Sequence, residues 1–222
     1  MTARGIAPGL RQDRVMLGSS LVLFAYLLFS FIDTGAKFLG LAGIPALQLA
    51  FMRFAGHFVI STSVVLSSGQ GFDSFSSPRA GLTILRGGCL LGATVTNFVA
   101  IKFIPLTLTS TILFLAPLII CGLSWPLLGQ RVGWLRITAI LVGFVGIVIA
   151  IRPFGVSFHP AVFLSLMSAL FFALYQIVTR ILAGSVATDT MQFYTGFVGS
   201  VALAPIAFWV GSARRPPKGG QF

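Results

Sequence analysis

The sequence predicts an all-α membrane protein, built as a bundle of several membrane-spanning helices. Of its 222 residues, 56% are hydrophobic and only 9% are charged, and the mean hydropathy is +0.99. Soluble domains, by contrast, carry about 25% charged residues. Apolar runs of about 20 residues, the length that a spanning helix needs, recur along the chain. A lipid bilayer is therefore the environment that the composition predicts.

Seven spans are expected after a short basic tail at residues 1–14. Segments rich in Gly, Pro and Ser separate the apolar runs and favour turns, and Pro45, Pro105 and Pro153 mark three of them. The predicted spans are residues 15–39, 46–66, 82–103, 106–128, 134–151, 162–182 and 191–211. The final segment, residues 212–222, is too short to cross a membrane and is predicted to be irregular.

The basic residues predict which way the chain is threaded. With the N-terminus in the cytoplasm, most loop arginines fall on the cytoplasmic side, as the positive-inside rule requires. They are Arg4, Arg11, Arg14, Arg79, Arg86, Arg131, Arg136 and Arg180, against Lys37, Lys102 and Arg152 outside. The C-terminal tail breaks the rule, because an odd number of spans places it outside. We expect an inner or plasma membrane protein with a cytoplasmic N-terminus.

An internal repeat accounts for that exception. Displacing the sequence by 143 residues aligns several pairs, namely Phe29 with Phe172, Asp33 with Gln176, Lys37 with Arg180, Phe54 with Phe197 and Gly56 with Gly199. Spans 162–182 and 191–211 are then copies of spans 15–39 and 46–66. The copies are five spans apart, an odd number, so they would point in opposite directions. Inverted repeats of this kind build many secondary transporters, with the substrate site between them.

The repeat predicts the domain organisation. Residues 15–153 form a first five-helix repeat, and residues 154–211 supply the first two helices of a second repeat. Seven of an expected ten spans are then present, and the second repeat is incomplete. We interpret the odd ending as a truncation, an alternative end, or a frameshift into PPKGGQF.

The clearest candidate site is a polar stripe on the first span. Ser30, Asp33, Thr34 and Lys37 recur at helical spacing and so share one helix face. Asp33 is the only acid at an apolar run, which makes it the natural proton or cation site. The alternative is an ordinary pair one turn apart, with both side chains reaching into the lipid headgroups.

Arg53 is the second candidate, because it lies too deep in its span to reach the headgroups easily. A central arginine costs about 2.5 to 3.5 kcal/mol on the insertion scale, whereas ten strongly apolar neighbours contribute roughly −3 to −6 kcal/mol. The span therefore inserts, and we expect Arg53 to face the bundle interior, where it would hold an anionic substrate group or pair with Asp33. His57 shares its face but is a weaker candidate, since a lone histidine is more often a packing residue.

Polar residues on two further spans complete the predicted cavity lining. Asn97 lies in span 82–103, and Tyr175 and Gln176 lie in span 162–182. Each alone is also explained as a contact between helices. Gly88 and Gly92, like Gly143 and Gly146, have the spacing of close helix approach. Pro117 and Pro205 either break their helices at a cavity or form tolerated kinks.

Several functions are disfavoured by what the sequence contains. The basic residues are scattered among apolar runs, which argues against nucleic-acid binding. Cys89 and Cys121 are far apart within apolar runs, so neither a disulfide nor a metal site is expected. A single intramembrane aspartate cannot form an aspartyl protease pair. We therefore expect no enzyme activity, no catalytic residues and no cofactor.

Two stretches resemble the EamA-type permeases of the drug/metabolite transporter superfamily. They are PLLGQRVGWLRITAILVGFVGIVIAIRP at 126–153 and NFVAIKFIPLTLTSTILFLAPL at 97–118. The usual family motif leucine-glycine-glutamate reads Leu128-Gly129-Gln130 here, so the acid is replaced. The resemblance covers residues 15–211 and implies ten spans in two inverted five-helix repeats, both termini in the cytoplasm, and alternating access for small organic metabolites.

The expected function is accordingly a multi-pass permease that works as a secondary transporter. Vitamins such as riboflavin, amino acids and drug-like compounds are the candidate substrates that the resemblance implies. The alternative is a non-transporting remnant or an assembly subunit. Its partner would be a second copy of the chain, or another protein that completes the second repeat. In both cases the lipid bilayer surrounds the chain.

Overall fold

The computed structural model describes residues 8–67, 77–129, 133–151 and 159–213, and the described part of the chain is helical throughout apart from its turns. The helices are α1 (Pro8–Leu41), α2 (Ala46–Ser67), α3 (Ala80–Phe103), α4 (Leu106–Leu113), α5 (Ala116–Leu128), α6 (Trp134–Ile151), α7 (Ala161–Leu182) and α8 (Thr188–Ala213). Six described stretches are long and apolar enough to cross a membrane, and α6 holds a shorter apolar segment, Ile137–Gly146. The predicted fold class, a multi-span helical membrane protein, is confirmed.

Helix bounds follow local sequence rules. α1 begins at Pro8, inside the expected tail, because proline fits the first helical position, where no backbone donor is needed. α3 ends at Phe103, and the next residue, Ile104, is extended because Pro105 follows it. The turns after α1 and α7 each contain a glycine with positive φ, Gly43 and Gly184. Much of both predicted tails, and Gln130, lie outside the described residues.

The predicted span 106–128 is divided into two helices. α4 ends at Leu113 and α5 begins at Ala116. Pro117 explains the break, because its nitrogen has no hydrogen to donate and its ring clashes with the carbonyl of Leu113. Pro205 does not divide α8, which remains helical on both sides of it. One predicted helix breaker therefore acts and the other is tolerated.

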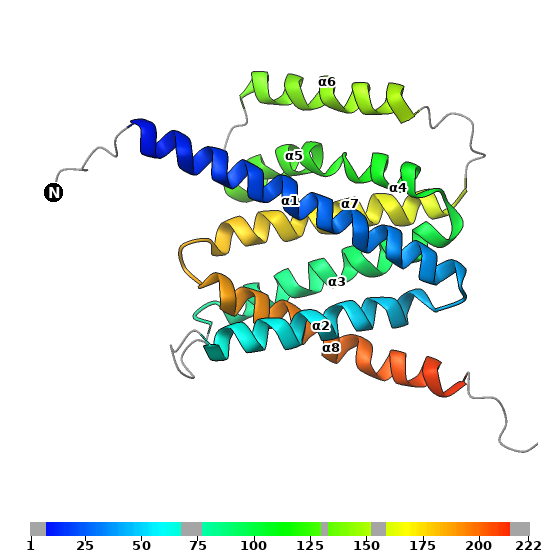
Figure 1. The fold of residues 1–222 in the computed structure, drawn as a ribbon. Helices are drawn as coiled ribbons and strands as arrows, with labels where there is room; N and C mark the ends of the chain where they lie inside the picture. Colours follow the sequence, from blue (N-terminus) through cyan, green and yellow to red (C-terminus); the bar gives the residue numbers. More distant parts are fainter. Residues whose placement is uncertain (1–7, 68–76, 130–132, 152–158, 214–222) are drawn as a thin grey trace, which may run out of the picture.

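α3 lies at the centre of the bundle (Figure 1). It packs most extensively on α7 and also contacts α1, α2, α4 and α8, while α2 and α8 form the other main helix pair. Close approach depends on glycine: a Cβ on Gly87 would lie 3.2 Å from the Val198 Cβ, and one on Gly92 would lie 3.1 Å from the Phe171 ring. A Cβ on Gly88, Gly143 or Gly146 would meet no atom within 4 Å. Of the four glycines predicted to allow close helix approach, only Gly92 therefore does so.

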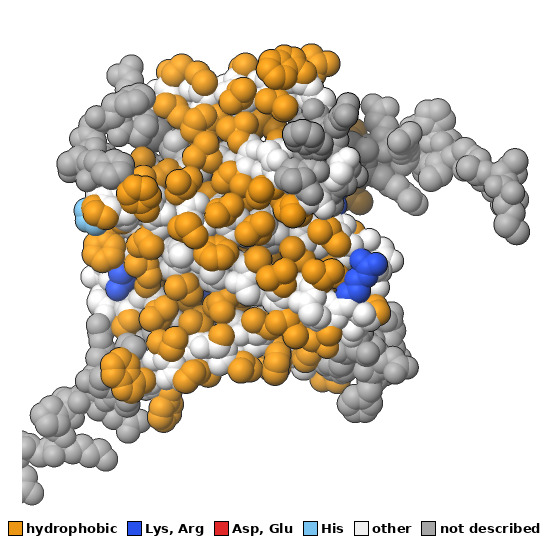
Figure 2. Space-filling view, turned by 180° about the vertical axis from the view of Figure 1, so that it is seen from behind, with side chains coloured by type: hydrophobic (Ala, Val, Ile, Leu, Met, Phe, Trp, Pro, Cys, Tyr) orange, Lys and Arg blue, Asp and Glu red, His pale blue; other side chains and the backbone are white. Residues whose placement is uncertain are grey.

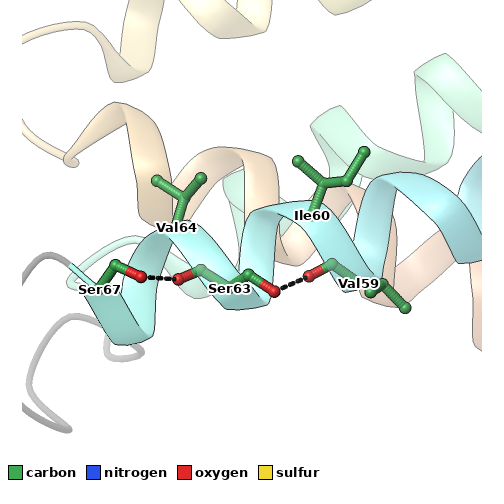
Figure 3. A pocket seen from close by; sticks show the side chains of 5 residues that line it. All are labelled: Val59, Ile60, Ser63, Val64 and Ser67. Carbon is green, nitrogen blue, oxygen red and sulfur yellow. Dashed lines mark hydrogen bonds between the residues drawn. The ribbon is translucent and has the colours of Figure 1, made fainter.

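The outer surface is apolar, as a lipid-facing surface must be. Figure 2 shows hydrophobic side chains spread over one broad face, with Lys and Arg side chains near its two edges. The outward face of α2 holds a shallow hollow of about 470 Å³ lined by Val59, Ile60, Ser63, Val64 and Ser67 (Figure 3). Ser63 donates to the Val59 carbonyl at 2.9 Å and Ser67 to the Ser63 carbonyl at 2.8 Å. Both hydroxyls are thus bonded within α2, and the hollow offers a ligand little beyond apolar surface.

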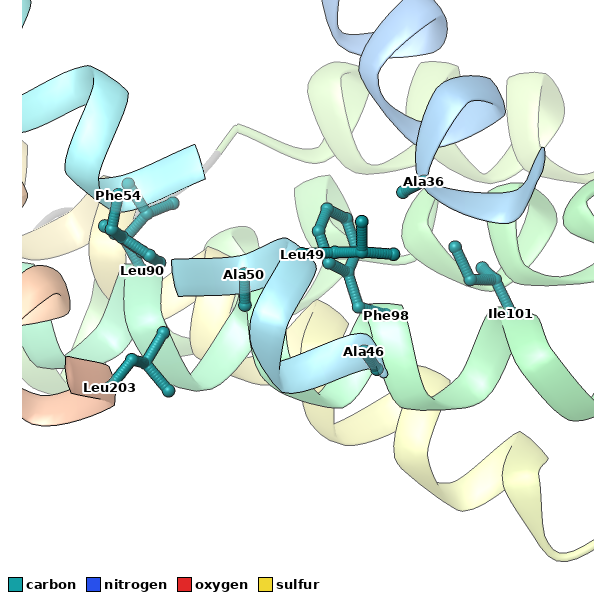
Figure 4. Close-up of a cluster of buried hydrophobic side chains, with 9 residues drawn as sticks. All are labelled: Ala36, Ala46, Leu49, Ala50, Phe54, Leu90, Phe98, Ile101 and Leu203. Atoms are coloured by element: carbon teal, nitrogen blue, oxygen red, sulfur yellow. The ribbon is translucent and has the colours of Figure 1, made fainter. Parts of the chain in front are cut away.

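The main buried cluster lies where α1, α2, α3 and α8 meet (Figure 4). Its members are Ala36, Ala46, Leu49, Ala50, Phe54, Leu90, Phe98, Ile101 and Leu203. Lipid tails are as apolar as leucine, so these contacts stabilise the bundle by close packing rather than by exclusion of water. The three alanines bring backbones together, and Phe54 packs directly on Gly199 of α8.

The packing predicts that Gly196→Ala destabilises the protein. A Cβ at position 196 would lie 2.7 Å from the Phe58 Cα and 2.8 Å from the Phe58 nitrogen, so α2 and α8 would have to separate. Overpacking of this kind costs about 1 to 3 kcal/mol. We expect a lower melting temperature in detergent. Gly56→Ala is the matched control, because that position of α2 has open space. Equal melting temperatures for the two variants would contradict the α2–α8 packing.

Candidate functional site

Two adjoining hollows inside the bundle form the candidate site, which we call the central cavity. They share Tyr26, Phe29, Asp33, Leu113 and Phe172. The larger, of about 450 Å³, lies among α1, α4, α5 and α7. The smaller, of about 80 Å³, reaches α2 and α3 as well. The larger volume is typical of a site for a small organic molecule.

Asp33 lies where the two hollows join. Its carboxylate accepts a hydrogen bond from Asn97 of α3, with 3.3 Å between Nδ2 and Oδ1. Arg53, on α2, lines the smaller hollow with it, and the two charges attract each other. Asp33 is half-buried, so the carboxylate is held by protein on one side and faces the cavity on the other. This arrangement suits a group that binds a cation.

Arg53 is held by aromatic rings. Its guanidinium carbon lies 5.3 Å from the centre of the Phe29 ring and 5.8 Å from that of Phe98, both within the range of cation–π attraction. Within the described ranges, no hydrogen bond ties down this guanidinium. Its N–H donors therefore remain available to an anionic group in the smaller hollow.

Aromatic and small polar residues form the rest of the cavity wall. Tyr26 and Phe29 of α1 face Phe172 of α7 across the space that both hollows share. Ser30 and Ser110 add hydroxyls to the larger hollow, and Pro117 lines it beside the break between α4 and α5. An organic molecule with a flat ring and a charged end matches such a lining.

The seven predicted site residues do not all meet in one place. The central cavity is lined by Asp33, Arg53, Asn97 and Gln176. Lys37 turns away, and its Nζ donates to the Ile104 carbonyl at 3.2 Å, beside the turn between α3 and α4. His57 lies with Gln192 and Asp189 in a separate hollow of about 210 Å³ between α2 and α8. Tyr175 faces Arg86. The polar stripe of α1 is thus divided between the cavity and a turn.

A buried arginine, Arg86, forms a polar network that the sequence analysis missed. Its side chain is only 2% exposed. Nε donates to Thr179 Oγ1 at 2.8 Å, Nη2 to the Tyr175 hydroxyl at 2.7 Å, and Nη1 both to Thr195 Oγ1 at 2.6 Å and to the Met191 carbonyl at 3.0 Å. The guanidinium carbon also lies 4.5 Å from the centre of the Tyr175 ring. We call this group the Arg86 clasp.

The clasp joins α3 to α7 and α8 with four of the five N–H donors of the arginine. All its acceptors are neutral. The sequence analysis counted Arg86 among the loop arginines, although the predicted span 82–103 includes it near its entry. Its position inside a span of about 20 residues was the signal that pointed to a buried arginine.

Curated proteins that are similar to this chain carry the name of a transporter. An S-adenosylmethionine uptake transporter of Rickettsia bellii (strain RML369-C) is 27% identical over 80% of this chain and 61% of its own length. The protein of the same name from Rickettsia prowazekii (strain Madrid E) is 24% identical over 80% of this chain and 60% of its own length. The chain thus spans about three fifths of the length of these curated relatives.

One protein of known crystal structure shares the fold. It superposes with a TM-score of 0.59 at 20% identity, over 86% of this chain and 69% of its own. Residues 16–152, more than half of the chain, match the EamA-like transporter family. The sequence resemblance that pointed to this family is confirmed, and the chain belongs to the EamA-like transporter family.

Proposed function

We propose that the chain acts as a secondary transporter that moves a small organic metabolite through the membrane by alternating access. The observation that carries the proposal is the central cavity, in which Asp33 and Arg53 offer opposite charges at membrane depth. Charges at that depth are costly and usually mark a substrate or ion pathway. Each of these two charges has few protein partners, which leaves both available to a ligand.

S-adenosylmethionine is the substrate that we propose. It was not among the vitamins, amino acids and drug-like compounds suggested by the sequence, and it comes from the names of the Rickettsia relatives. Its carboxylate suits the free N–H donors of Arg53, and its ammonium and sulfonium centres suit Asp33. Its adenine ring and its sulfonium suit the aromatic wall of Tyr26, Phe29 and Phe172.

The proposed transporter has a cytoplasmic N-terminus and an inverted repeat in its helices. α2 and α8 agree with the 143-residue displacement: Ala46, the first residue of α2, corresponds to Asp189, the second residue of α8. α7 pairs with α3, and α8 with α2, so the two proposed units interlock. The central cavity lies along that junction, where alternating access requires the substrate to bind.

A second candidate function, that of an assembly subunit, is favoured by the state of α1. None of its most apolar stretch is buried within the chain, and Phe31 and Phe38 are 69% and 72% exposed. Such a face suits lipid, but it also suits helices from a second copy or another protein. Light scattering in detergent separates the two: a multiple of 23.6 kDa favours assembly, and a single chain that binds substrate contradicts it.

The first prediction concerns Arg53. Arg53→Ala should weaken S-adenosylmethionine binding roughly 10- to 100-fold, because a hydrogen bond to a charged group contributes about 1.5 to 3 kcal/mol. Arg53→Lys should recover only part of the affinity, since lysine lacks the planar fork. Titration calorimetry on the purified chain measures this, with Arg180→Ala, an exposed arginine of α7, as the control. Unchanged affinity in Arg53→Ala would remove Arg53 from the site.

The second prediction concerns Asp33 and the charge on sulfur. S-adenosylhomocysteine lacks the methyl group and the positive charge of S-adenosylmethionine. Asp33→Asn should reduce the preference for the charged ligand by roughly tenfold, because only the carboxylate attracts the sulfonium. The ratio of the two dissociation constants is the measurement, and Asp189→Asn on α8 is the control. A ratio that stays at its original value would mean that Asp33 does not face the sulfur.

A further inference from the structure

The Arg86 clasp lies at the opposite end of α3 from the polar contacts of the central cavity. Arg86 is in the second turn of α3, and Asn97 is eleven residues further on, about 16 Å along a helix that rises 1.5 Å per residue. The other members of the clasp come from the last turns of α7 and the first turns of α8. The clasp therefore closes the end of the bundle at which α7 turns into α8, which is the end nearest the N-terminus of α1 in Figure 1.

The clasp is connected to the cavity wall through α7. The Tyr175 ring, which Arg86 contacts, stacks on Phe172 with 6.1 Å between ring centres. Phe172 lines both hollows of the central cavity, and Gln176, next to Tyr175, lines the larger one. Adjacent turns of one helix thus carry the clasp and the wall, so any shift of α7 that breaks the clasp also moves the wall.

The chemistry of the clasp suits a contact that opens and closes. Thr179 donates its own hydroxyl hydrogen to the Tyr175 carbonyl at 2.6 Å, and Thr195 donates to the Met191 carbonyl at 2.8 Å. Both hydroxyls therefore keep a hydrogen bond when Arg86 leaves. A carboxylate partner would instead be left buried and unpaired, which is strongly unfavourable.

The other end of the bundle cannot form the same clasp. Under the 143-residue displacement, Tyr175, Thr179 and Thr195 correspond to Ile32, Ala36 and Met52 on α1 and α2. None of these side chains has a hydroxyl, so an arginine facing them would lack the three hydroxyl acceptors that Arg86 has. Among the described residues, a clasp of this kind is therefore found at the α7–α8 end.

We propose that the Arg86 clasp is the gate that closes the central cavity at the α7–α8 end, with Arg86 as the positioning residue that holds α7, and hence Phe172, against the cavity. The proposal rests on alternating access as the proposed function. It predicts a resting state closed at the α7–α8 end, and opening of that end requires Arg86 to leave its three hydroxyl partners.

Cysteine accessibility in sealed vesicles tests the gate without any substrate. The reporter is Thr94→Cys, which lines the smaller hollow, in a background that carries Cys89→Ser and Cys121→Ser. A charged, membrane-impermeant methanethiosulfonate is added to one side of the vesicle membrane or the other. A separate variant, Ser185→Cys in the turn between α7 and α8, shows which side of the membrane the α7–α8 end faces. With the clasp intact, the reporter should react slowly from the α7–α8 side.

Tyr175→Phe and Thr195→Val each remove one acceptor and keep the side-chain volume. Each should raise the reaction rate from the α7–α8 side roughly tenfold, because a hydrogen bond to a charged group is lost, and leave the rate from the other side unchanged or lower. Thr96→Val is the control, since the Thr96 hydroxyl bonds only to carbonyls of its own helix. Arg86→Met should have the largest effect if it folds.

A purely structural clasp gives a different result. Loss of packing would raise the rate equally from both sides, and that outcome, or an unchanged rate from the α7–α8 side, overturns the gate. Because the assay contains no S-adenosylmethionine, failure of the gate is distinguishable from failure of the proposed substrate, which the Arg53 titration tests separately.

Discussion

The organisation of this protein depends on how it accommodates positive charge at membrane depth. Arg53 and Arg86 both lie within apolar helices, and they are treated in opposite ways. Arg86 is enclosed by four neutral acceptors from α7 and α8, so the bundle itself supplies what water would supply elsewhere. Arg53 has aromatic rings and the attraction of Asp33 but no hydrogen bond within the part of the chain that the structure describes. The fold satisfies the N–H donors of Arg86, whereas those of Arg53 are the ones that we propose bind a ligand.

The central position of α3 makes this division possible. It carries Arg86 toward one end and Asn97 toward the other, so one helix positions both the Arg86 clasp and part of the cavity wall. Gly87 and Gly92 let α8 and α7 approach it closely enough for short hydrogen bonds to form. A larger residue at Gly87 would push away the backbone of Thr195, which is one of the acceptors of Arg86. Packing and polar recognition are thus set by the same few positions.

The sequence predicted the fold well because membrane spans leave a strong signal. Apolar runs and prolines located the helices to within a few residues, except at the start of α1 and at the break between α4 and α5. Side-chain direction was harder to predict. Helical spacing placed Asp33 and Lys37 on one face, but the structure sends Lys37 to a carbonyl at a turn because that acceptor comes from α3, far away in sequence. Tyr175 was predicted to line the cavity, whereas Arg86 draws its hydroxyl away. Such outcomes depend on tertiary partners that no single span reveals.

The neutrality of the acceptors around Arg86 has an electrical consequence. With no carboxylate in the clasp, a whole positive charge stays at membrane depth, and any movement of Arg86 along the membrane normal does work against the membrane potential. Carrying one elementary charge across the full potential amounts to about 2.3 kcal/mol per 100 mV, and a partial displacement takes a proportional share. In the proposed gate, the balance between closed and open forms would therefore depend on the voltage of the membrane that contains it.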